Sequence, residues 1–369
     1  MTEFPVARIN TAAISQNFDR LRDAYSDCNF MAVVKANAYG HGLAQVAQIL
    51  KQADALGVAR ISEGKYLRAL GIDQRIVILE GCSSTEEIEC AAKLELEIVV
   101  HDLNHLDLIK NLSAENKLHI WLKIDTGMGR LGVHPQQFQD CINFLDSSEV
   151  VAKPIKVITH LASAEKIDNS ITAKQVKVFG ETIGMFNGDI SFANSAAILS
   201  WRTSFNRSPT LNFSGKNWLR PGLALFGVSP FPEKISKDLN LIPAMTFESC
   251  VIAIKTIKKD AFVGYGSTWQ AKEDTNVAVV AVGYGDGYPR QLPQGTPVLI
   301  NKYRAKLIGR VSMDMITVDI TDIPLIKIGD PALLWGESLP IEEIASLAQM
   351  IPYELMCGLS NRVKRIYIN

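Results

Sequence analysis

The sequence predicts an α/β protein: an eight-stranded β/α barrel followed by a mostly β C-terminal domain. Up to Pro230, eight short apolar runs alternate with amphipathic helical stretches, which is the pattern of parallel strands covered by helices. No GxGxxG turn follows the first run, so an open doubly wound sheet, the main rival, is disfavoured. Beyond Pro230 strand-like runs dominate, which indicates a change of architecture.

The strand-like runs of the predicted barrel contain few or no charged residues, as is typical of strands that are covered on both faces. They lie at 30–34, 55–59, 75–79, 97–101, 119–124, 155–160, 189–193 and 222–227. A helix is predicted ahead of the first run, over 15–25, with Ser15 as its N-cap.

The second half of the predicted architecture begins after a loop-like connector, PFPEKISKDLNLIPAM. Six strand-like runs follow: FESCVIAIKTI, NVAVVAVGY, TPVLIN, KLIGRVSM, ITVDI and PALLW. One predicted helix, PIEEIASLAQM, interrupts this strand-rich part of the chain. We therefore expect two domains, a barrel over 1–235 and a mostly β domain over 236–369.

Composition narrows the class of protein. The chain has 369 residues, 47% hydrophobic and 21% charged, which is typical of a soluble globular protein. Its net charge of -1 gives no reason to expect nucleic acid or an anionic membrane as a partner. The N-terminus has no apolar core of signal-peptide length, and the six scattered cysteines form no CxxC pair. We expect a cytoplasmic protein with reduced cysteines.

Lys35 is the first candidate for chemistry. It lies in MAVVKANAYGHG, where an apolar run ends at this lysine and a polar segment with glycines follows. A lysine at a strand end is either a solvated cap or an amine that attacks a carbonyl. The active site of a β/α barrel lies at the carboxyl ends of its strands. The other polar residues expected at those ends are Lys123, Asp125, His160, Asn194, Ser195 and Arg220.

A phosphate site is expected near the last two strands of the barrel. Such sites use hydroxyl groups and glycine-rich backbone, which Ser195, Gly222 and Leu223 offer here. A lysine, a phosphate cradle and Arg220 at one mouth together suggest pyridoxal 5'-phosphate held by Lys35 as a Schiff base.

Nine motifs, in this order and at this spacing, resemble those of the alanine racemase family. They cover both predicted domains: AVVKANAYGHG, DTGMGRLGV, THLASAE, ANSAA, RPGLALFG, GYGSTW, VGYGDGY, RVSMDM and PYELMCGLSNRV. The resemblance implies an isomerase that interconverts L-alanine and D-alanine on a pyridoxal phosphate aldimine and supplies D-alanine for peptidoglycan in cell wall biogenesis.

The resemblance also implies two catalytic bases. Lys35 would act on one face of the substrate Cα, and Tyr265 of a partner subunit on the other, so the protein would be a homodimer. A free tyrosine has a pKa near ~10, and the family suggests His160 and Arg220 as the neighbours that help it act as a base. Arg220 would also hydrogen-bond the pyridine nitrogen.

The remaining site residues are implied by the family in the same way. Tyr39 and Tyr353 would join Ser195, Gly222 and Leu223 at the phosphate. Arg130 and the backbone N–H of Met313 would bind the substrate carboxylate. Tyr284 and Asp314 would line the entrance, and Lys123 matches a lysine that many family members carry as a carbamate.

Other interpretations of these residues stay open. An isolated His160 can be a core histidine, Arg220 a turn residue, and Tyr265 or Tyr353 an ordinary aromatic. No metal is expected, because His101 and His105 lack a third ligand. Alternative functions are a broader-specificity racemase, an amino-acid decarboxylase or a non-catalytic pyridoxal-phosphate-binding protein. Departures from the family pattern are Gly285, Phe226 and Lys364.

Overall fold

The computed structural model describes residues 4–112, 117–166, 170–201 and 211–369. The chain forms two compact units. We call the first the barrel unit; it comprises Phe18–Ala38 and Leu43–Leu225. We call the second the β unit; it comprises the N-terminal residues through Asn17, together with Tyr39–Gly42 and Phe226–Asn369.

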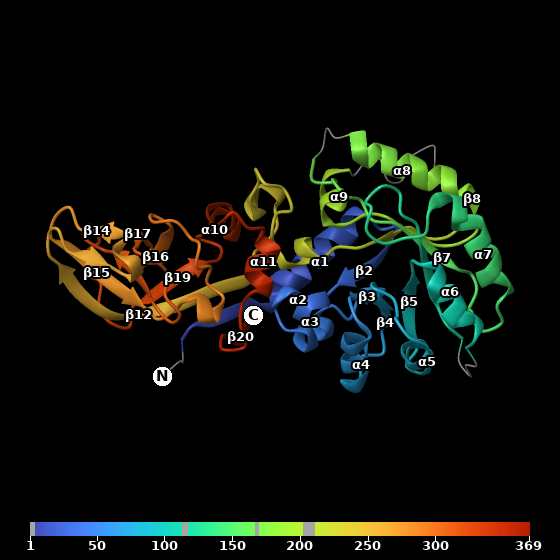
Figure 1. Ribbon diagram of the computed structural model, residues 1–369, viewed down its shortest axis with the longest axis horizontal. Helices are drawn as coiled ribbons and strands as arrows, with labels where there is room; N and C mark the ends of the chain where they lie inside the picture. Colours follow the sequence, from blue (N-terminus) through green and yellow to red (C-terminus); the bar gives the residue numbers. More distant parts are fainter. Residues whose placement is uncertain (1–3, 113–116, 167–169, 202–210) are drawn as a thin grey trace. The chain divides into compact units, whose positions relative to one another are not determined.

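A parallel eight-stranded sheet forms the centre of the barrel unit in the described part of the chain, in the order β11, β2, β3, β4, β5, β6, β7, β9 (Figure 1). Two isolated parallel bridges, Ile190 to Asn217 and Asn194 to Arg220, link the last strand to the first and close the ring. The strands are β2 (Asn29–Val33), β3 (Ala55–Val58), β4 (Arg75–Ile78), β5 (Leu96–Val100), β6 (Ile120–Lys123), β7 (Lys156–Ile158), β9 (Ile190–Ser191) and β11 (Trp218–Leu219).

Helices follow the strands, as the alternating pattern predicted. They are α3 (Leu43–Ile49), α4 (Ile61–Ala69), α5 (Thr85–Lys93), α6 (Leu103–Lys110), α7 (Phe138–Ser147), α8 (Ser170–Ile183) and α9 (Ser195–Ser200). A small parallel pair, β8 (Met185–Phe186) and β10 (Asn212–Phe213), lies beside them. The predicted barrel, followed by a mostly β domain, is confirmed.

Seven of the eight predicted barrel strands coincide with observed strands, but the eighth is wrong. The run at 222–227 contains a 3₁₀ turn, Leu223–Phe226, and the eighth strand is instead Trp218–Leu219, which pairs with Asn29 and Phe30. The run looked like a strand because its residues are fully buried. A short buried apolar run has the same appearance in sequence whether it is extended or helical.

Side chains from seven strands fill the interior of the barrel, and two tryptophans are the largest of them. Trp121 and Trp218 pack edge to face with ring centroids 5.5 Å apart. Smaller residues from the neighbouring strands complete the cluster: Met31, Ala55, Val77, Val99 and Ile158. The barrel is thus a packed core and not a pore.

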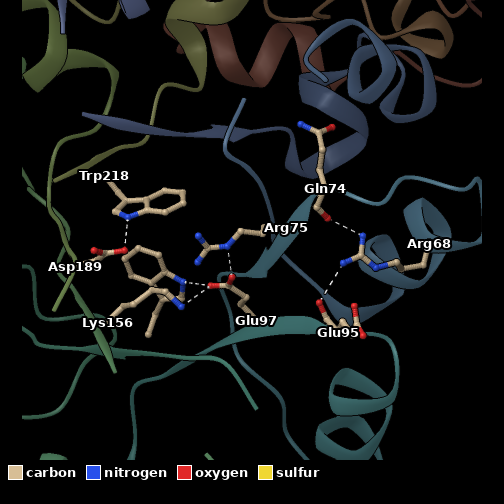
Figure 2. Close-up of polar contacts among 9 residues, drawn as sticks. Arg68, Gln74, Arg75, Glu95, Glu97, Lys156, Asp189 and Trp218 are labelled. Carbon is tan, nitrogen blue, oxygen red and sulfur yellow. Dashed lines mark hydrogen bonds and ion pairs between the residues drawn. The ribbon is translucent and has the colours of Figure 1, made fainter. Parts of the chain in front are cut away.

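A buried carboxylate, Glu97, organises the amino ends of the barrel strands (Figure 2). It accepts hydrogen bonds from Arg75 at 2.5 Å, from the Trp121 indole at 2.7 Å and from Lys156 at 3.2 Å. Burial alone would raise the pKa of Glu97, but the Arg75 hydrogen bond and the Lys156 charge together hold it below its usual value. Removal of one partner would leave a buried charge without a counter-charge. We therefore expect this network to be required for the stability of the barrel.

The β unit contains an eight-stranded sheet among the described residues, in the order β15, β18, β17, β16, β19, β12, β1, β20. An additional pairing of β12 with β15 closes six of these strands into a ring. The strands are β1 (Val6–Asn10), β12 (Met245–Ile257), β15 (Thr275–Val280), β16 (Pro297–Ile300), β17 (Tyr303–Ile308), β18 (Ile316–Asp319), β19 (Pro331–Trp335) and β20 (Lys364–Ile368). The same unit contains the hairpin β13 (Phe262–Val263) and β14 (Trp269–Gln270), with helices α10 (Ile341–Ala348) and α11 (Pro352–Cys357).

The N-terminal segment differs from its prediction in two ways. Strand β1 was not foreseen; it pairs with β12 and β20, which places the start of the chain in the β unit. Helix α1 (Thr11–Ala24) begins four residues before the predicted cap Ser15, because the Asn10 side chain accepts the Ala13 N–H at 2.9 Å and so caps the helix. The chain passes between the two units after Asn17, Ala38, Gly42 and Leu225. The division into two domains after residue 235 stays a prediction.

In the described part of the chain, no helix combines the length and the apolar character that a membrane span requires.

Candidate active site

Strand β2 places Lys35 at the carboxyl end of the barrel. The strand ends at Val33, Val34 is fully buried, and Lys35, two residues past the strand, is half-buried. The chain then enters a left-handed turn, α2 (Lys35–Tyr39), in which Ala36, Asn37, Ala38 and Tyr39 have φ between 52 and 54°. A left-handed conformation costs roughly 1–2 kcal/mol for each non-glycine residue, so other contacts must hold this turn in place.

The buried Arg220 and the half-buried His160 form a pair at the ends of β11 and β7. One guanidinium nitrogen of Arg220 donates to the Ser191 hydroxyl, and the other donates to the Thr159 carbonyl oxygen at 2.6 Å and lies 3.4 Å from His160 Nδ1. Burial lowers the pKa of Arg220 to about 9, so the guanidinium stays charged at neutral pH. Burial and then the Arg220 charge hold the pKa of His160 well below its usual value, so His160 is neutral.

Lys123, the last residue of β6, lies close to Arg220 and to other positive charges. Burial, then Arg220, then Arg130 lower its pKa to about 8. A lysine with this pKa is partly neutral near physiological pH, and a neutral amine is a nucleophile. The charge of Lys35 also lowers the pKa of Lys123 and that of His160.

The loop after β6 carries Arg130 on an ordered turn. Asp125 Oδ1 accepts three backbone hydrogen bonds, from Gly127 and Met128 at 2.9 Å and from Gly129 at 3.1 Å. Burial alone would raise the pKa of Asp125, but these three N–H groups lower it, so the carboxylate stays ionised. The turn thus orders the backbone that leads to Arg130, and the Arg130 side chain is exposed to solvent.

Ser195 and Gly222 meet at the ends of β9 and β11. Ser195 is the first residue of α9, whose N-cap Asn194 accepts the Ala197 N–H at 3.1 Å. The buried Ser195 hydroxyl accepts the N–H of Gly222 at 2.9 Å and that of Ala224 at 3.3 Å. Leu223 opens a 3₁₀ turn, and the first N–H groups of such a turn have no acceptor within it. A hydroxyl, a helix start and a turn start at one place suit a phosphate group.

The donors of the barrel unit fit pyridoxal phosphate. Its aldehyde needs a primary amine, its phosphate needs neutral N–H and O–H donors, and its ring nitrogen needs a hydrogen-bond partner. Lys35, the Ser195–Gly222 pair and the buried guanidinium of Arg220 supply these groups from the same end of the barrel.

Tyr39 and Tyr353 are brought together within the β unit. Their ring centroids lie 5.7 Å apart, and Tyr39 also packs against Phe226 at 5.2 Å. Burial, and then Tyr353, raise the pKa of Tyr39, so its hydroxyl stays protonated and can donate a hydrogen bond. The two phenols that the family assigns to the phosphate are therefore neighbours.

Tyr284, Met313 and Asp314 also lie together in the β unit, on two loops joined by backbone hydrogen bonds. Tyr284 N–H donates to the Ser312 carbonyl at 3.0 Å, and Gly285 N–H donates to the Met313 carbonyl at 2.9 Å. Arg362 donates to Asp314 at 2.8 Å and pairs with the buried Asp286 at 3.3 Å.

Gly285, a departure from the family pattern, lies close to Arg362. A Cβ at this position would lie 2.5 Å from the Arg362 guanidinium and 3.0 Å from the Met313 carbonyl oxygen. An alanine here would therefore require the exposed end of Arg362 to shift.

Tyr265, the second candidate base, lies on an exposed turn of the β unit. It begins the 3₁₀ turn Tyr265–Ser267, after the hairpin strand β13, and its side chain is 71% exposed. Exposed apolar residues of the same unit include Phe262, Met313 and Met315.

The structure adds supporting residues that sequence reasoning missed. Ser191 contacts Arg220, and the buried Gln175 of α8 donates to the His160 carbonyl oxygen at 3.1 Å and accepts the Ala162 N–H at 2.9 Å. Glu63 accepts the N–H of Ala36, the residue after Lys35. His101 Nε2 lies 3.0 Å from the Glu80 carbonyl oxygen, and His105 Nδ1 accepts the His101 N–H at 3.5 Å.

Two family descriptions match the chain, and together they span nearly all of it. "Alanine racemase, N-terminal domain" matches residues 9–230, and "Alanine racemase, C-terminal domain" matches residues 244–367. A protein of Vibrio cholerae named alanine racemase is 42% identical over 361 residues, which is 98% of this chain and 97% of that protein.

Solved structures are similar over the full length. The biosynthetic alanine racemase from Pseudomonas aeruginosa has a TM-score of 0.91 and 35% identity, with 100% of both chains covered. Alanine racemase from Bartonella henselae, solved with covalently bound pyridoxal phosphate, has a TM-score of 0.86 and 28% identity, again with 100% of both chains covered.

Proposed function

Since this chain belongs to the alanine racemase family, we propose that it is an alanine racemase, an isomerase that interconverts L-alanine and D-alanine with pyridoxal 5'-phosphate. The relatives that have this name are similar to this chain over nearly their whole length. The residues that the family assigns to the site are present here.

The observation that carries the proposal is the gathering of positive charge at the carboxyl ends of the barrel strands. The charges of Lys35, Arg130 and Arg220 all lower the pKa of Lys123, and the charge of Asp125 opposes them there. The same three charges and that of Lys123 also lower the pKa of His160. Such a cluster is stable when an anion lies among its members. A phosphate group and an amino-acid carboxylate are two anions that it would hold.

Lys35 would hold the cofactor covalently, and Ser195, Gly222 and Leu223, with Tyr39 and Tyr353, would hold its phosphate. Pyridoxal phosphate, when bound, withdraws electrons from the substrate Cα and so makes its hydrogen acidic. Arg220 would donate to the ring nitrogen. Because a guanidinium keeps its proton, that nitrogen would stay unprotonated and its electron withdrawal would stay moderate.

Racemisation requires one group to remove the α-proton and another to return a proton from the opposite face. Lys35 would serve one face and Tyr265 of a partner subunit the other. The large exposure of Tyr265 in the single chain supports this assignment, because a side chain that enters a partner's site is exposed when that partner is absent. His160, held neutral beside Arg220, would assist the tyrosine.

Substrate binding would use Arg130 and the backbone N–H of Met313. A guanidinium binds a carboxylate through two parallel hydrogen bonds, which orients the α-hydrogen toward a base. Tyr284 and Asp314 would line the entrance. Lys123 would be carbamylated, which turns a cation into an anion that can orient Arg130.

The assembly and the biological role follow from the same proposal. The protein would act as a homodimer in the cytoplasm, where it supplies D-alanine for peptidoglycan and hence for cell wall biogenesis.

The test is an assay of the purified protein with pyridoxal phosphate and L-alanine, in which D-alanine is quantified by chiral chromatography. L-Serine and L-lysine serve as competing substrates. Formation of D-alanine in clear excess over the other D-amino acids is the expected result. Comparable rates for all three substrates would identify a broader racemase, and cofactor absorption without any D-amino acid would identify a non-catalytic binder.

A further inference from the structure

The left-handed turn after Lys35 is held by three hydrogen bonds to groups outside the strained residues. Ala38 N–H donates to the Val34 carbonyl oxygen at 2.8 Å, and Asn37 Oδ1 accepts the Leu43 N–H at 2.8 Å. The third contact lies nearest to the lysine and comes from another βα segment: Ala36 N–H donates to Glu63 Oε1 at 2.8 Å.

Glu63 uses its second oxygen on the neighbouring strand end. Oε2 accepts the N–H of Ala59 at 2.8 Å and that of Arg60 at 3.2 Å, where the chain passes from β3 into α4. One carboxylate therefore links the backbone beside Lys35 to the end of the next strand. An ordinary helix-capping carboxylate contacts only its own helix start.

Close packing of helix α4 fixes the position of this carboxylate. A Cβ on Gly64 would lie 2.9 Å from Ile78 Cδ1 and 3.1 Å from Leu96 Cδ1, so the helix lies against the barrel strands with no spare room. The reach of Glu63 toward Ala36 is thus set by the core and not by a flexible surface helix.

We propose that Glu63 is a positioning residue for Lys35: its carboxylate holds the strained backbone at Ala36, and this fixes the direction of the lysine amine. This role rests on the proposed function, in which that amine binds the cofactor and moves a proton. The hydrogen bonds that the structure gives Glu63 go to Ala36, Ala59 and Arg60 and not to Arg130, so its loss should lower kcat and leave KM for alanine almost unchanged.

The neighbouring segment provides a matched control. Glu87 is the third residue of α5, as Glu63 is of α4, and its Oε2 accepts the Ser83 N–H at 2.7 Å and the Ser83 hydroxyl at 3.0 Å. Glu63→Gln and Glu87→Gln each weaken a carboxylate at a helix start, but only Glu63→Gln removes an acceptor that the Lys35 turn shares with β3. An amide has one acceptor oxygen, so it cannot hold both sets of N–H groups.

The first measurement is hydrogen exchange, followed by mass spectrometry in short peptides that cover 35–38. Ala36 N–H should be protected in the wild-type protein although its side chain is exposed, and it should exchange at least ~10-fold faster in Glu63→Gln. Glu87→Gln should match the wild type at these residues. A wild-type Ala36 amide that exchanges like a free peptide would overturn the proposal without any variant.

The second measurement follows the amine itself. Pyridoxal phosphate is added to cofactor-depleted full-length protein, and borohydride traps the adduct on Lys35 for mass spectrometry. We expect trapping in Glu63→Gln to be roughly 10- to 100-fold slower than in the wild type, and trapping in Glu87→Gln to be unchanged. Equal exchange and equal trapping in the two variants would show that Glu63 only caps its helix.

Two further outcomes are distinguishable. If Glu63→Gln does not fold, Glu63→Asp is the second variant. It keeps the charge but is one methylene shorter, so it can reach β3 or Ala36 but not both. Wild-type behaviour in this variant would contradict the proposal.

If the wild-type protein does not racemise alanine while exchange and trapping behave as expected, the proposed function fails and the role of Glu63 stands.

Discussion

The guanidinium of Arg220 lies 3.4 Å from Nδ1 of His160 at the carboxyl ends of the barrel strands, where Arg220 is buried and His160 is half-buried. Because a guanidinium can only donate, Nδ1 must accept, and a neutral His160 carries its proton on Nε2. The pair therefore combines a charged donor, Arg220, with a neutral imidazole, His160.

The His160–Arg220 pair predicts how stability depends on pH. The pKa of His160 is lowered by folding, so below its unfolded value of ~6.5 the unfolded chain binds a proton that the folded chain does not, and stability falls as the pH falls. His160→Gln should remove about 1 kcal/mol of the loss between pH 6.5 and 5.5. Urea unfolding at both pH values measures it, and equal losses in the two proteins would refute the assignment.

The network at the opposite end of the barrel predicts a large loss of stability. Glu97→Gln leaves Lys156 and Arg75 without their carboxylate and should destabilise the protein by about 3 kcal/mol or more. Glu80→Gln is the control, because its ion pair with Arg60 at 3.5 Å is exposed and contributes at most ~1 kcal/mol. Urea unfolding compares the two variants, and equal shifts would show that Glu97 is not a structural centre.

Lys123 is predicted to form a carbamate with dissolved carbon dioxide. Its neutral amine would attack CO₂, a nitrogen–carbon bond would form and a proton would be released. With a pKa of about 8, the neutral fraction rises as the pH increases from 6 to 8, so the modification should increase as well. Protein equilibrated with ¹³C-bicarbonate should give a carbamate NMR signal that Lys123→Met lacks. A signal of equal size in the variant would assign it to another lysine.

The shared site predicts complementation between subunits. Lys35→Ala and Tyr265→Phe homodimers should each be nearly inactive. A mixed dimer, however, contains one site with both bases. After the two variants are unfolded and refolded together, roughly a quarter of the wild-type activity should return. If no activity returns although mixed dimers are detected by native mass spectrometry, the two bases belong to one chain.

Much of the fold could be predicted because the barrel strands are buried on both faces. Their apolar runs and the helices between them define the architecture, and Lys35 was correctly placed at a strand end. The buried turn at Leu223–Phe226 was misread, since burial makes a turn as apolar as a strand. Strand β1 escaped notice because its pairing partners, β12 and β20, lie more than two hundred residues away in sequence.

The positions of His160, Ser195 and Arg220 near strand ends could be predicted, because each follows from the residue's place in its own segment of the chain. The role of Glu63 could not be predicted, because its link to Ala36 crosses from one βα segment to another. A carboxylate at the third position of a helix indicates a cap, and nothing local reveals a second contact. Gln175 and Ser191 were missed for the same reason.

Exchange of the α-hydrogen in deuterated water tests most directly whether Lys35 and Tyr265 serve opposite faces of the substrate. The wild-type protein should racemise either enantiomer and incorporate deuterium at Cα. Tyr265→Phe should still exchange the α-hydrogen of one enantiomer, without inversion, and should lose exchange with the other, because only Lys35 remains. Unchanged racemisation by Tyr265→Phe would contradict the two-base assignment.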